Sequence, residues 1–305
     1  MRRTRKNRTR RLLVRRAVLL LAAAGIVAGV VFGMKTGLGI VREAILAVAP
    51  ASSVSVSAGS VPELSAADPE GEAVQRLREL SAQEPRLAEI VDDCQSYPEA
   101  LLDMLSRNLD MLDFVLGYPE NKGREPAKSI GEMEPGKMPL LLQYDPRWGY
   151  TGYGDSIIAV AGCGPTCLSM VAADLTGDSG ITPAVVARYA QEKGYYVENV
   201  GTSWSLMSEG CAEFGLQAEE LSLSRGVLEN ALAQGRPVIC SMGPGDFTTA
   251  GHFIVITGES GGQFSVCDPN SRERSGMLWD YDRLASQIRN LWAFSKEEKK
   301  QEIFY

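Results

Sequence analysis

Residues 162–170 read Gly-Cys-Gly-Pro-Thr-Cys-Leu-Ser-Met, and this stretch decides the local fold around a candidate nucleophile. Pro165 suits the first turn of a helix, where its missing N–H costs nothing, and the apolar run 167–175 continues the helix. The stretch therefore predicts a helix with Cys163 at its N-terminus. The helix dipole there favours a thiolate, and free backbone N–H groups are able to hold a developing oxyanion.

The glycines on either side of Cys163 favour a functional interpretation of this turn. Gly162 and Gly164 carry no side chain, so a substrate backbone can approach the sulfur closely. The alternative is an ordinary glycine-rich turn from strand to helix with a buried thiol. Cys167 lies one helical turn further on, and we assign it to packing beside Met170 and Val171.

His252 is the only histidine in the 305 residues. It opens the run 251–257, Gly-His-Phe-Ile-Val-Ile-Thr, whose β-branched residues predict a strand. A solitary histidine can simply bond a backbone carbonyl, but a chain that also carries Cys163 favours a catalytic base. If imidazole assists thiol chemistry here, His252 supplies it.

A catalytic imidazole needs a partner for its second nitrogen, and the sequence offers two. Asp268 lies 16 residues after His252 in the run Cys-Asp-Pro-Asn at 267–270, and we prefer it. The alternative makes Asp268 a turn former before Pro269 and Asn270 the partner. Gln143, 20 residues before Cys163, is a candidate amide donor to the oxyanion.

The charge distribution separates the chain into two parts. The net charge is −7, but residues 1–43 hold 11 of the 31 Lys and Arg and one of the 38 Asp and Glu. The remainder is therefore strongly acidic, which argues against nucleic acid as a partner.

The N-terminal segment predicts a membrane anchor. Residues 1–16 are basic, and residues 17–34 are uncharged and mostly apolar. Eighteen helical residues span about 27 Å, close to the hydrocarbon core of a bilayer. Because positive flanks stay inside, we expect a cytoplasmic tail and a single-pass signal anchor that contacts the lipid bilayer. The alternative is a long cleavable signal peptide, with Ala47-Val48-Ala49 as a small-residue site.

Patterns beyond the anchor predict a division into segments. We expect a linker at 35–70, a helical spacer at 71–118, a second linker at 119–137, a catalytic domain at 138–295 and a polar tail at 296–305. Two or three amphipathic helices account for the spacer, either by packing or as a partner-binding stalk. In the catalytic domain, helices at 183–193 and 205–214 precede strands at 237–242, 252–257 and 263–267, which favours an α+β fold.

The six cysteines are too scattered for a disulfide scaffold, and the sequence contains no C-x-x-C pair. With one histidine, no zinc ligand set can be assembled from these residues. We therefore expect no metal and no other cofactor.

The runs GCGPTCLSM, GHFIVITG and CDPN, in this order, resemble the family of double-glycine leader (bacteriocin-processing) cysteine peptidases. The resemblance covers about residues 139–294 and implies a papain-like fold, with helices packed on an antiparallel sheet. It implies Cys163 as nucleophile, His252 as base and later acid, Asp268 as orienting residue and Gln143 as oxyanion donor. Exporter members place this domain in the cytoplasm beside a transporter, whereas this sequence has one membrane segment and no GxxxxGK[ST] loop.

The sequence thus predicts an extracytoplasmic, membrane-anchored thiol peptidase that acts on a peptide or protein through an acyl-enzyme. We expect Gly162, Gly164 and Gly251 to contact the substrate or the oxyanion. The loop 243–251 either shapes the cleft or is an ordinary strand connection. The alternatives are an acyl transferase, a cell-wall peptide amidase and a non-catalytic peptide-binding module, and the oligomeric state is left open.

Overall fold

The computed structural model describes residue 62 and residues 64–298. No helix within these residues is both long enough and apolar enough to cross a membrane. The predicted tail at 1–16 and anchor at 17–34 lie outside the described residues. All described residues belong to one compact unit.

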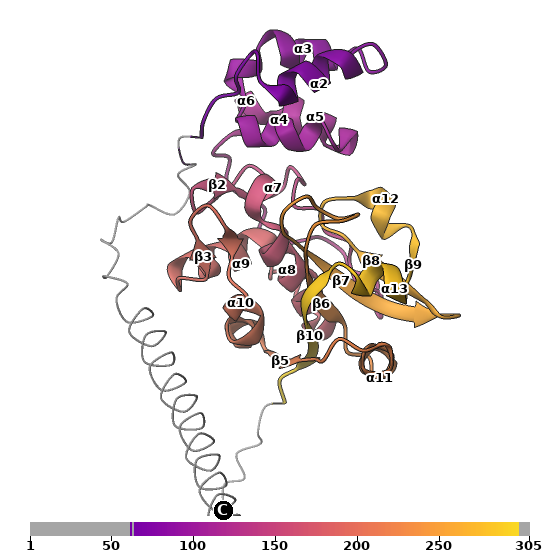
Figure 1. Ribbon diagram of the computed structural model, residues 1–305. Coiled ribbons are helices and arrows are strands. Elements are labelled where there is room, and N and C mark those ends of the chain that lie inside the picture. Colours follow the sequence, from indigo (N-terminus) through magenta and orange to yellow (C-terminus); the bar gives the residue numbers. More distant parts are fainter. Residues whose placement is uncertain (1–61, 63, 299–305) are drawn as a thin grey trace, which may run out of the picture. The chain divides into compact units, whose positions relative to one another are not determined.

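The first part of the described chain, residues 64–121, is called here the helical region (Figure 1). It holds five short α-helices and two 3₁₀ turns, where the sequence predicted two or three amphipathic helices. They are α2 (Glu72–Leu80), α3 (Leu87–Asp92), α4 (Glu99–Leu105), α5 (Leu112–Leu116) and α6 (Tyr118–Asn121), with 3₁₀ turns at Cys94–Ser96 and Leu109–Met111. Pro85 lies in the break between α2 and α3, and Pro98 lies in the break before α4, because proline cannot continue a helix.

Helices of this length are not stable alone in water, so their apolar faces must be covered. Leu101, Leu102 and Leu105 on α4 are completely buried. They belong to a hydrophobic cluster that also contains Leu142 and Tyr150 from beyond the helical region. The helical region therefore packs directly on the part of the chain that precedes Cys163.

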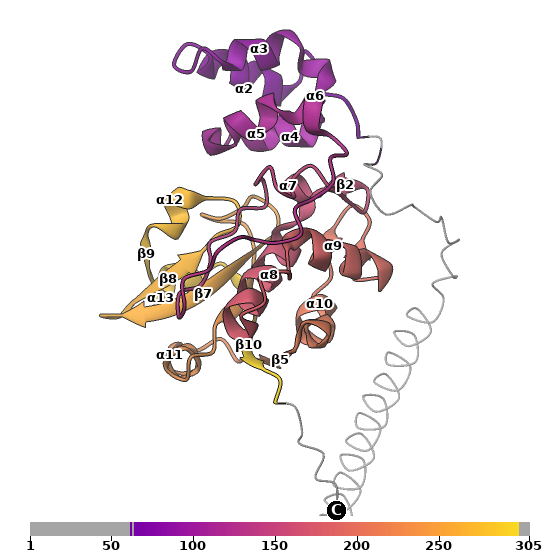
Figure 2. The same cartoon turned by 180° about the vertical axis from the view of Figure 1, so that it is seen from behind.

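The remainder of the described chain is a mixed α/β structure around one six-stranded sheet, as expected from the sequence (Figure 2). The strand order is β5-β10-β6-β7-β8-β9, and every neighbouring pair is antiparallel. The strands are β5 (Leu216–Glu220), β6 (Val238–Met242), β7 (His252–Ser260), β8 (Gln263–Cys267), β9 (Leu278–Asp280) and β10 (Ile288–Lys296). Two small ribbons pair β1 (Gly152–Tyr153) with β2 (Ser156–Ile157) and β3 (Tyr196–Val197) with β4 (Gly201–Thr202).

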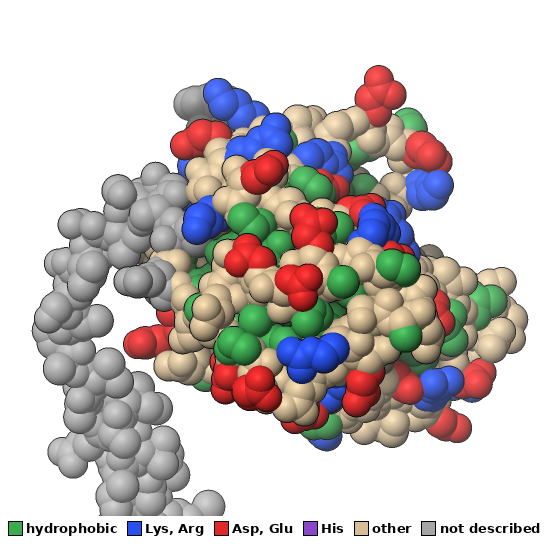
Figure 3. Space-filling model, turned by 90° about the horizontal axis from the view of Figure 1, so that it is seen from above, with side chains coloured by type: hydrophobic (Ala, Val, Ile, Leu, Met, Phe, Trp, Pro, Cys, Tyr) green, Lys and Arg blue, Asp and Glu red, His purple; other side chains and the backbone are tan. Residues whose placement is uncertain are grey.

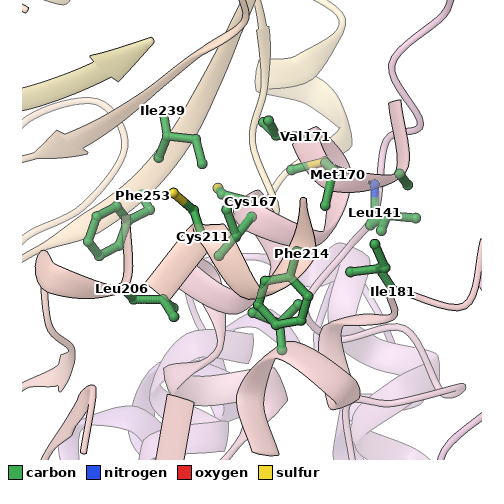
Figure 4. Close-up of a cluster of buried hydrophobic side chains, with 14 of the residues drawn as sticks. Leu141, Cys167, Met170, Val171, Ile181, Leu206, Cys211, Phe214, Ile239 and Phe253 are labelled. Carbon is green, nitrogen blue, oxygen red and sulfur yellow. Dashed lines mark hydrogen bonds between the residues drawn. The ribbon is translucent and has the colours of Figure 1, made fainter. Parts of the chain in front are cut away.

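Helices cover both faces of the sheet. Those of this part are α7 (Ile158–Ala161), α8 (Cys163–Thr176), α9 (Pro183–Glu192), α10 (Ser205–Ser208), α11 (Arg225–Ala233), α12 (Arg272–Ser275) and α13 (Tyr281–Ala285), with a 3₁₀ helix at Gly210–Phe214. On one face, Ile239 and Phe253 pack with Met170 and Val171 of α8 (Figure 4). On the other, Cys240 and Ile254 pack with Leu228 of α11. Because successive strand residues point to opposite faces, β6 and β7 contribute to both cores.

The helix predicted to begin at Cys163 is confirmed as α8, and Cys167 is fully buried in its core, as expected. All six cysteines are free. The hairpin β7–β8 turns through Gly261 and Gly262, both with positive φ, which glycine adopts without strain. This turn, together with a one-residue register shift between Ile256 and Gly258, brings His252 near the residues after β8.

Candidate active site

The Cys163 side chain is held at the junction of two helices. The short helix α7 ends at Ala161 and is capped by Gly162, whose N–H donates to the Ile158 carbonyl at 2.8 Å. Thr166 then closes the first turn of α8, since its hydroxyl donates to the Gly162 carbonyl at 2.7 Å. Cys163 is half-buried, at a helix end whose first N–H groups have no partner within the helix.

The glycines beside Cys163 are explained by packing in the structure. A Cβ on Gly162 would lie 2.5 Å from the Ile158 carbonyl oxygen, and one on Gly164 would lie 2.8 Å from the Thr202 side chain. Both positions therefore need glycine for close contact with protein atoms. Gly251 differs, because nothing lies within 4 Å of its Cβ position and it lines the open cleft.

His252 and Asp268 form a buried pair. His252 Nε2 lies 2.7 Å from Asp268 Oδ1, and the two side chains are 7% and 0% exposed. The register opposes Val255 and Cys267, so the next residue, Asp268, falls diagonally across from His252 on the same side of the sheet. Of the two predicted partners, the structure brings Asp268 to the imidazole. The side-chain oxygen of Asn270 is buried without a partner.

Three donors converge on the Asp268 carboxylate. Besides the imidazole, Oδ1 accepts from the Asn270 N–H at 2.8 Å, and Oδ2 accepts from Arg274 Nε at 2.5 Å. Burial works against ionisation, but His252 and Arg274 outweigh it, so the pKa of Asp268 lies below its usual value. The carboxylate is therefore an anion that faces His252.

The imidazole environment favours the protonated form. Burial lowers the pKa of His252, but the charge and hydrogen bond of Asp268 and the neighbouring Cys163 thiol raise it, to about 10 in total. His252 can therefore hold a proton at neutral pH, in the cleft that Cys163 also lines.

A cleft opens on both sides of Cys163. One cavity of about 860 Å³ and another of about 340 Å³ are both lined by Cys163, His252, Gly251 and Val160. Helix α4 contributes Asp103 to the larger and Met104 to the smaller cavity. The helical region is therefore one wall of the cleft, which sequence patterns did not indicate.

Gln143 is buried and lines the smaller cavity together with Cys163, but its amide hydrogens face backbone carbonyls. Nε2 donates to Ala159 at 2.8 Å and to Val160 at 3.3 Å, while Oε1 is buried without a partner. The backbone N–H of Gln143 donates to the Pro269 carbonyl at 2.8 Å, beside the turn that carries Asp268. Its oxyanion role stays a prediction, and the observed contacts brace the segments before Cys163 and after β8.

The loop 243–251 lines the smaller cavity and is tied down at its centre. Arg283 Nε and Nη2 donate to the two carboxylate oxygens of Asp246 at 2.8 and 2.7 Å. Gln287 Nε2 donates to Asp246 Oδ2 at 2.7 Å, and Gln287 Oε1 accepts from the Asp246 N–H at 2.6 Å. The loop thus shapes the cleft in this structure. Neither Arg283 nor Gln287 carried a sequence signal, since both are distant in the chain.

Comparison with known proteins identifies the class of this domain. A family model described as the Peptidase_C39 like family matches residues 137–299, just over half of the chain. The chain therefore belongs to this family, which confirms the resemblance expected from its motifs.

Solved structures include similar domains. The peptidase domain of Streptococcus ComA, a bifunctional ABC transporter involved in a quorum-sensing pathway, is 19% identical, with a TM-score of 0.37, over 45% of this chain and 93% of that one. A protein of Bacillus anthracis described as a C39-like peptidase is 18% identical, with a TM-score of 0.32, over 53% and 96%. None of the curated proteins compared with this chain matches it.

Proposed function

We propose that this protein is a papain-like thiol peptidase in which Cys163 is the nucleophile, His252 the acid and base, and Asp268 the residue that orients the imidazole. The observation that carries the proposal is the 2.7 Å contact of His252 Nε2 with Asp268, in a cleft that also holds Cys163 at the start of α8. Membership in a peptidase-like family supports a peptide as substrate.

The proposed reaction proceeds through an acyl-enzyme. The Cys163 thiolate attacks the carbonyl carbon of a peptide, a C–S bond forms, and the oxyanion accepts from N–H groups in the first turn of α8. The imidazolium of His252 donates its proton to the leaving amine as the C–N bond breaks. Water then attacks the thioester while His252 takes its proton, which releases the acid and restores the thiolate.

We further propose that the reaction takes place outside the cytoplasm, with residues 17–34 as the anchor in the membrane. The support is the run of basic residues before this apolar stretch, which places the following chain on the opposite side of the bilayer. A cysteine protease added to sealed cell-derived vesicles of known orientation tests this placement. Protection of residues 64–298 in right-side-out vesicles would contradict it.

The test of the proposed chemistry is alkylation of the full chain by iodoacetamide at about pH 5.5, followed by peptide mass spectrometry. Thiolate reacts and thiol does not, so an imidazole-paired Cys163 should be labelled rapidly, and His252→Ala should slow the labelling. Cys267 is the internal control, because burial raises the pKa of its thiol to about 12.

Peptide cleavage by the native chain, lost in Cys163→Ser, would then establish hydrolysis. Product analysis with added amines separates hydrolysis from acyl transfer. Labelling of Cys163 that is slow and unchanged in His252→Ala would reject the peptidase proposal and favour a peptide-binding module.

A further inference from the structure

One side chain of the helical region reaches the turn that carries Asp268. Asn108 Nδ2 donates to the Asn270 carbonyl at 2.6 Å, across 162 positions of sequence. Asn270 is the residue whose N–H donates to Asp268 Oδ1 at 2.8 Å. A continuous series of hydrogen bonds thus runs from Asn108 through Asn270 and Asp268 to the imidazole of His252.

The orientation of the Asn108 amide is determined on both sides. Its Oδ1 accepts from the Asp110 N–H at 3.2 Å, which caps the 3₁₀ turn Leu109–Met111. If the amide were flipped, its oxygen would face the Asn270 carbonyl oxygen and its NH₂ group would face the Asp110 N–H. Neither pair can form a hydrogen bond. The donor of Asn108 is therefore committed to Asn270.

The backbone that carries Asn108 is held in place at the end of α4. Its backbone N–H donates to the Met104 carbonyl at 2.9 Å, at the end of α4. Leu105 on that helix is completely buried. Asn108 also lines the smaller cavity together with Cys163, His252 and Asn270. Its contact with the turn is thus part of the site, and not a distant surface contact.

The turn itself has few other anchors from outside. Arg274 and Ser275, which bond Asp268, belong to α12 and follow directly in the chain. From more distant parts of the chain, the Gln143 N–H donates to Pro269 at 2.8 Å and Asn108 donates to Asn270. Without the Asn108 donor, the Asn270 carbonyl would lose this hydrogen bond, and the turn could then shift.

We propose that Asn108 is a positioning residue of the active site, through which the helical region holds the Asp268 turn and so aligns the carboxylate with His252. The inference rests on the proposed function for its catalytic meaning. The helical region is on this account a working part of the site, in addition to its place as a wall of the cleft.

The test compares Asn108→Ser with Asn121→Ser in the full chain. Serine keeps a capping oxygen for the 3₁₀ turn but cannot reach Asn270. Asn121 is a matched control, because it is also half-buried in the helical region and its Nδ2 also donates to a backbone carbonyl, that of Gly117, at 2.7 Å. Both variants lose one such bond, and only one loses contact with the Asp268 turn.

The measurement is the titration of His252 by NMR with labelled histidine, which reports one residue because the chain has one histidine. Asn108→Ser should lower the imidazole pKa by about one unit and slow Cys163 alkylation at pH 5.5 about tenfold. Asn121→Ser should leave both unchanged. The charged groups around the imidazole are Asp268 and Arg274, with Asp246 and Arg107 in the same cavity, and neither variant changes them.

Identical His252 titrations in Asn108→Ser, Asn121→Ser and the native chain would overturn the proposal. If Asn108→Ser folds poorly, Asn108→Thr offers the same cap with the same missing donor, and the NMR signal of the folded molecules alone is compared. Neither measurement requires a substrate, so the result is independent of whether peptide hydrolysis is found.

Discussion

At the scale of single residues, the candidate site depends on how Asp268 is held. The carboxylate is buried, yet it accepts from an imidazole, a backbone N–H and a guanidinium. Burial of a charge is tolerated only when it is paired and hydrogen-bonded in this way. The same arrangement keeps a proton on His252, which is the form that the proposed acid step requires.

The His252–Asp268 pair predicts how stability changes with pH. The folded-state pKa of His252 is raised from 6.5 to about 10. Its contribution to the free energy of unfolding is therefore fully present below about pH 6.5 and is lost as the pH rises through about 10. The pKa of Asp268 is lowered in the folded state. Its contribution to the free energy of unfolding is therefore present above about pH 4 and is lost as the pH falls through this lowered pKa.

We therefore expect the melting temperature to fall by several degrees between pH 7 and pH 9.5, as measured by circular dichroism. His252→Ala should remove most of this decrease in melting temperature at alkaline pH. An equal decrease in the variant would show that other groups cause it.

At the scale of elements, the start of α8 is defined by contacts that leave no room for side chains. The helix begins between Gly162 and Gly164, and β4 lies directly against it through Thr202. Ribbons as short as β3–β4 are marginal by themselves, so this contact also helps to hold them. The Thr202 hydroxyl lies 2.8 Å from that of Tyr153, which links β4 to β1.

A pair of glycine substitutions tests this packing. Gly164→Ala should destabilise the protein by about 1–3 kcal/mol, because the added methyl group would overlap the Thr202 side chain. Gly226→Ala in α11 is the control, since nothing lies within 4 Å of its Cβ position and alanine favours a helix by up to about 1 kcal/mol.

Urea midpoints of the two variants give the comparison. Equal stability of Gly164→Ala and the native chain would mean that β4 moves away from the added methyl group without a loss of stability. The packing explanation for Gly164 would then be wrong.

At the scale of the whole described molecule, the helical region and the sheet-containing part share a hydrophobic cluster and a cleft. Phe114 stacks on Tyr150 with ring centroids 4.1 Å apart, and the Tyr150 hydroxyl donates to the Phe114 carbonyl at 2.8 Å. Figure 3 shows acidic and basic side chains interspersed over the face seen from above, with smaller apolar areas between them. The two signs of charge are less evenly mixed in the cleft, because three carboxylates and no Lys or Arg line its larger cavity.

Truncation tests the shared cluster. A chain that begins at residue 64 keeps every described contact and should unfold cooperatively. A chain that begins at residue 122 exposes Leu142, Tyr144 and Tyr150, each worth about 1.5–3 kcal/mol of burial, and should aggregate or lose its cooperative transition. Size-exclusion chromatography and thermal melts distinguish the two. A monomeric, cooperative shorter chain would show that the helical region is dispensable for folding.

The carboxylates of the larger cavity, Glu99, Asp103 and Asp155, predict a preference for cationic peptides. Glu99 is exposed and forms no ion pair with the other described residues. Glu99→Gln should reduce the ratio of kcat/KM for lysine-containing over glutamate-containing peptides by up to about fivefold, because an exposed ion pair contributes at most about 1 kcal/mol. Glu89→Gln, on α3 and outside the cleft, is the control. A ratio that is insensitive to Glu99 and to 1 M salt would contradict the prediction.

Local sequence by itself determined the helix at Cys163, the strands that contain His252 and precede Asp268, and the family to which the chain belongs. These features depend on near neighbours: a proline in a first turn, β-branched runs and a glycine turn. It did not indicate β10, which lies between β5 and β6 inside the sheet, or the number of helices in the helical region. A strand's neighbours in a sheet are chosen by burial of both faces, which no local pattern encodes.

Only the tertiary structure decided which distant side chains complete the site. Gly162 and Gly164 were expected to admit substrate, and the tertiary structure adds a packing role, because a Cβ at these positions would meet Ile158 and Thr202. Asn108 meets Asn270 across 162 positions, and Arg283 meets Asp246 across 37. Such contacts form when the three hydrophobic clusters bring separate segments together, and hydrogen bonds then satisfy the polar groups left at the junction.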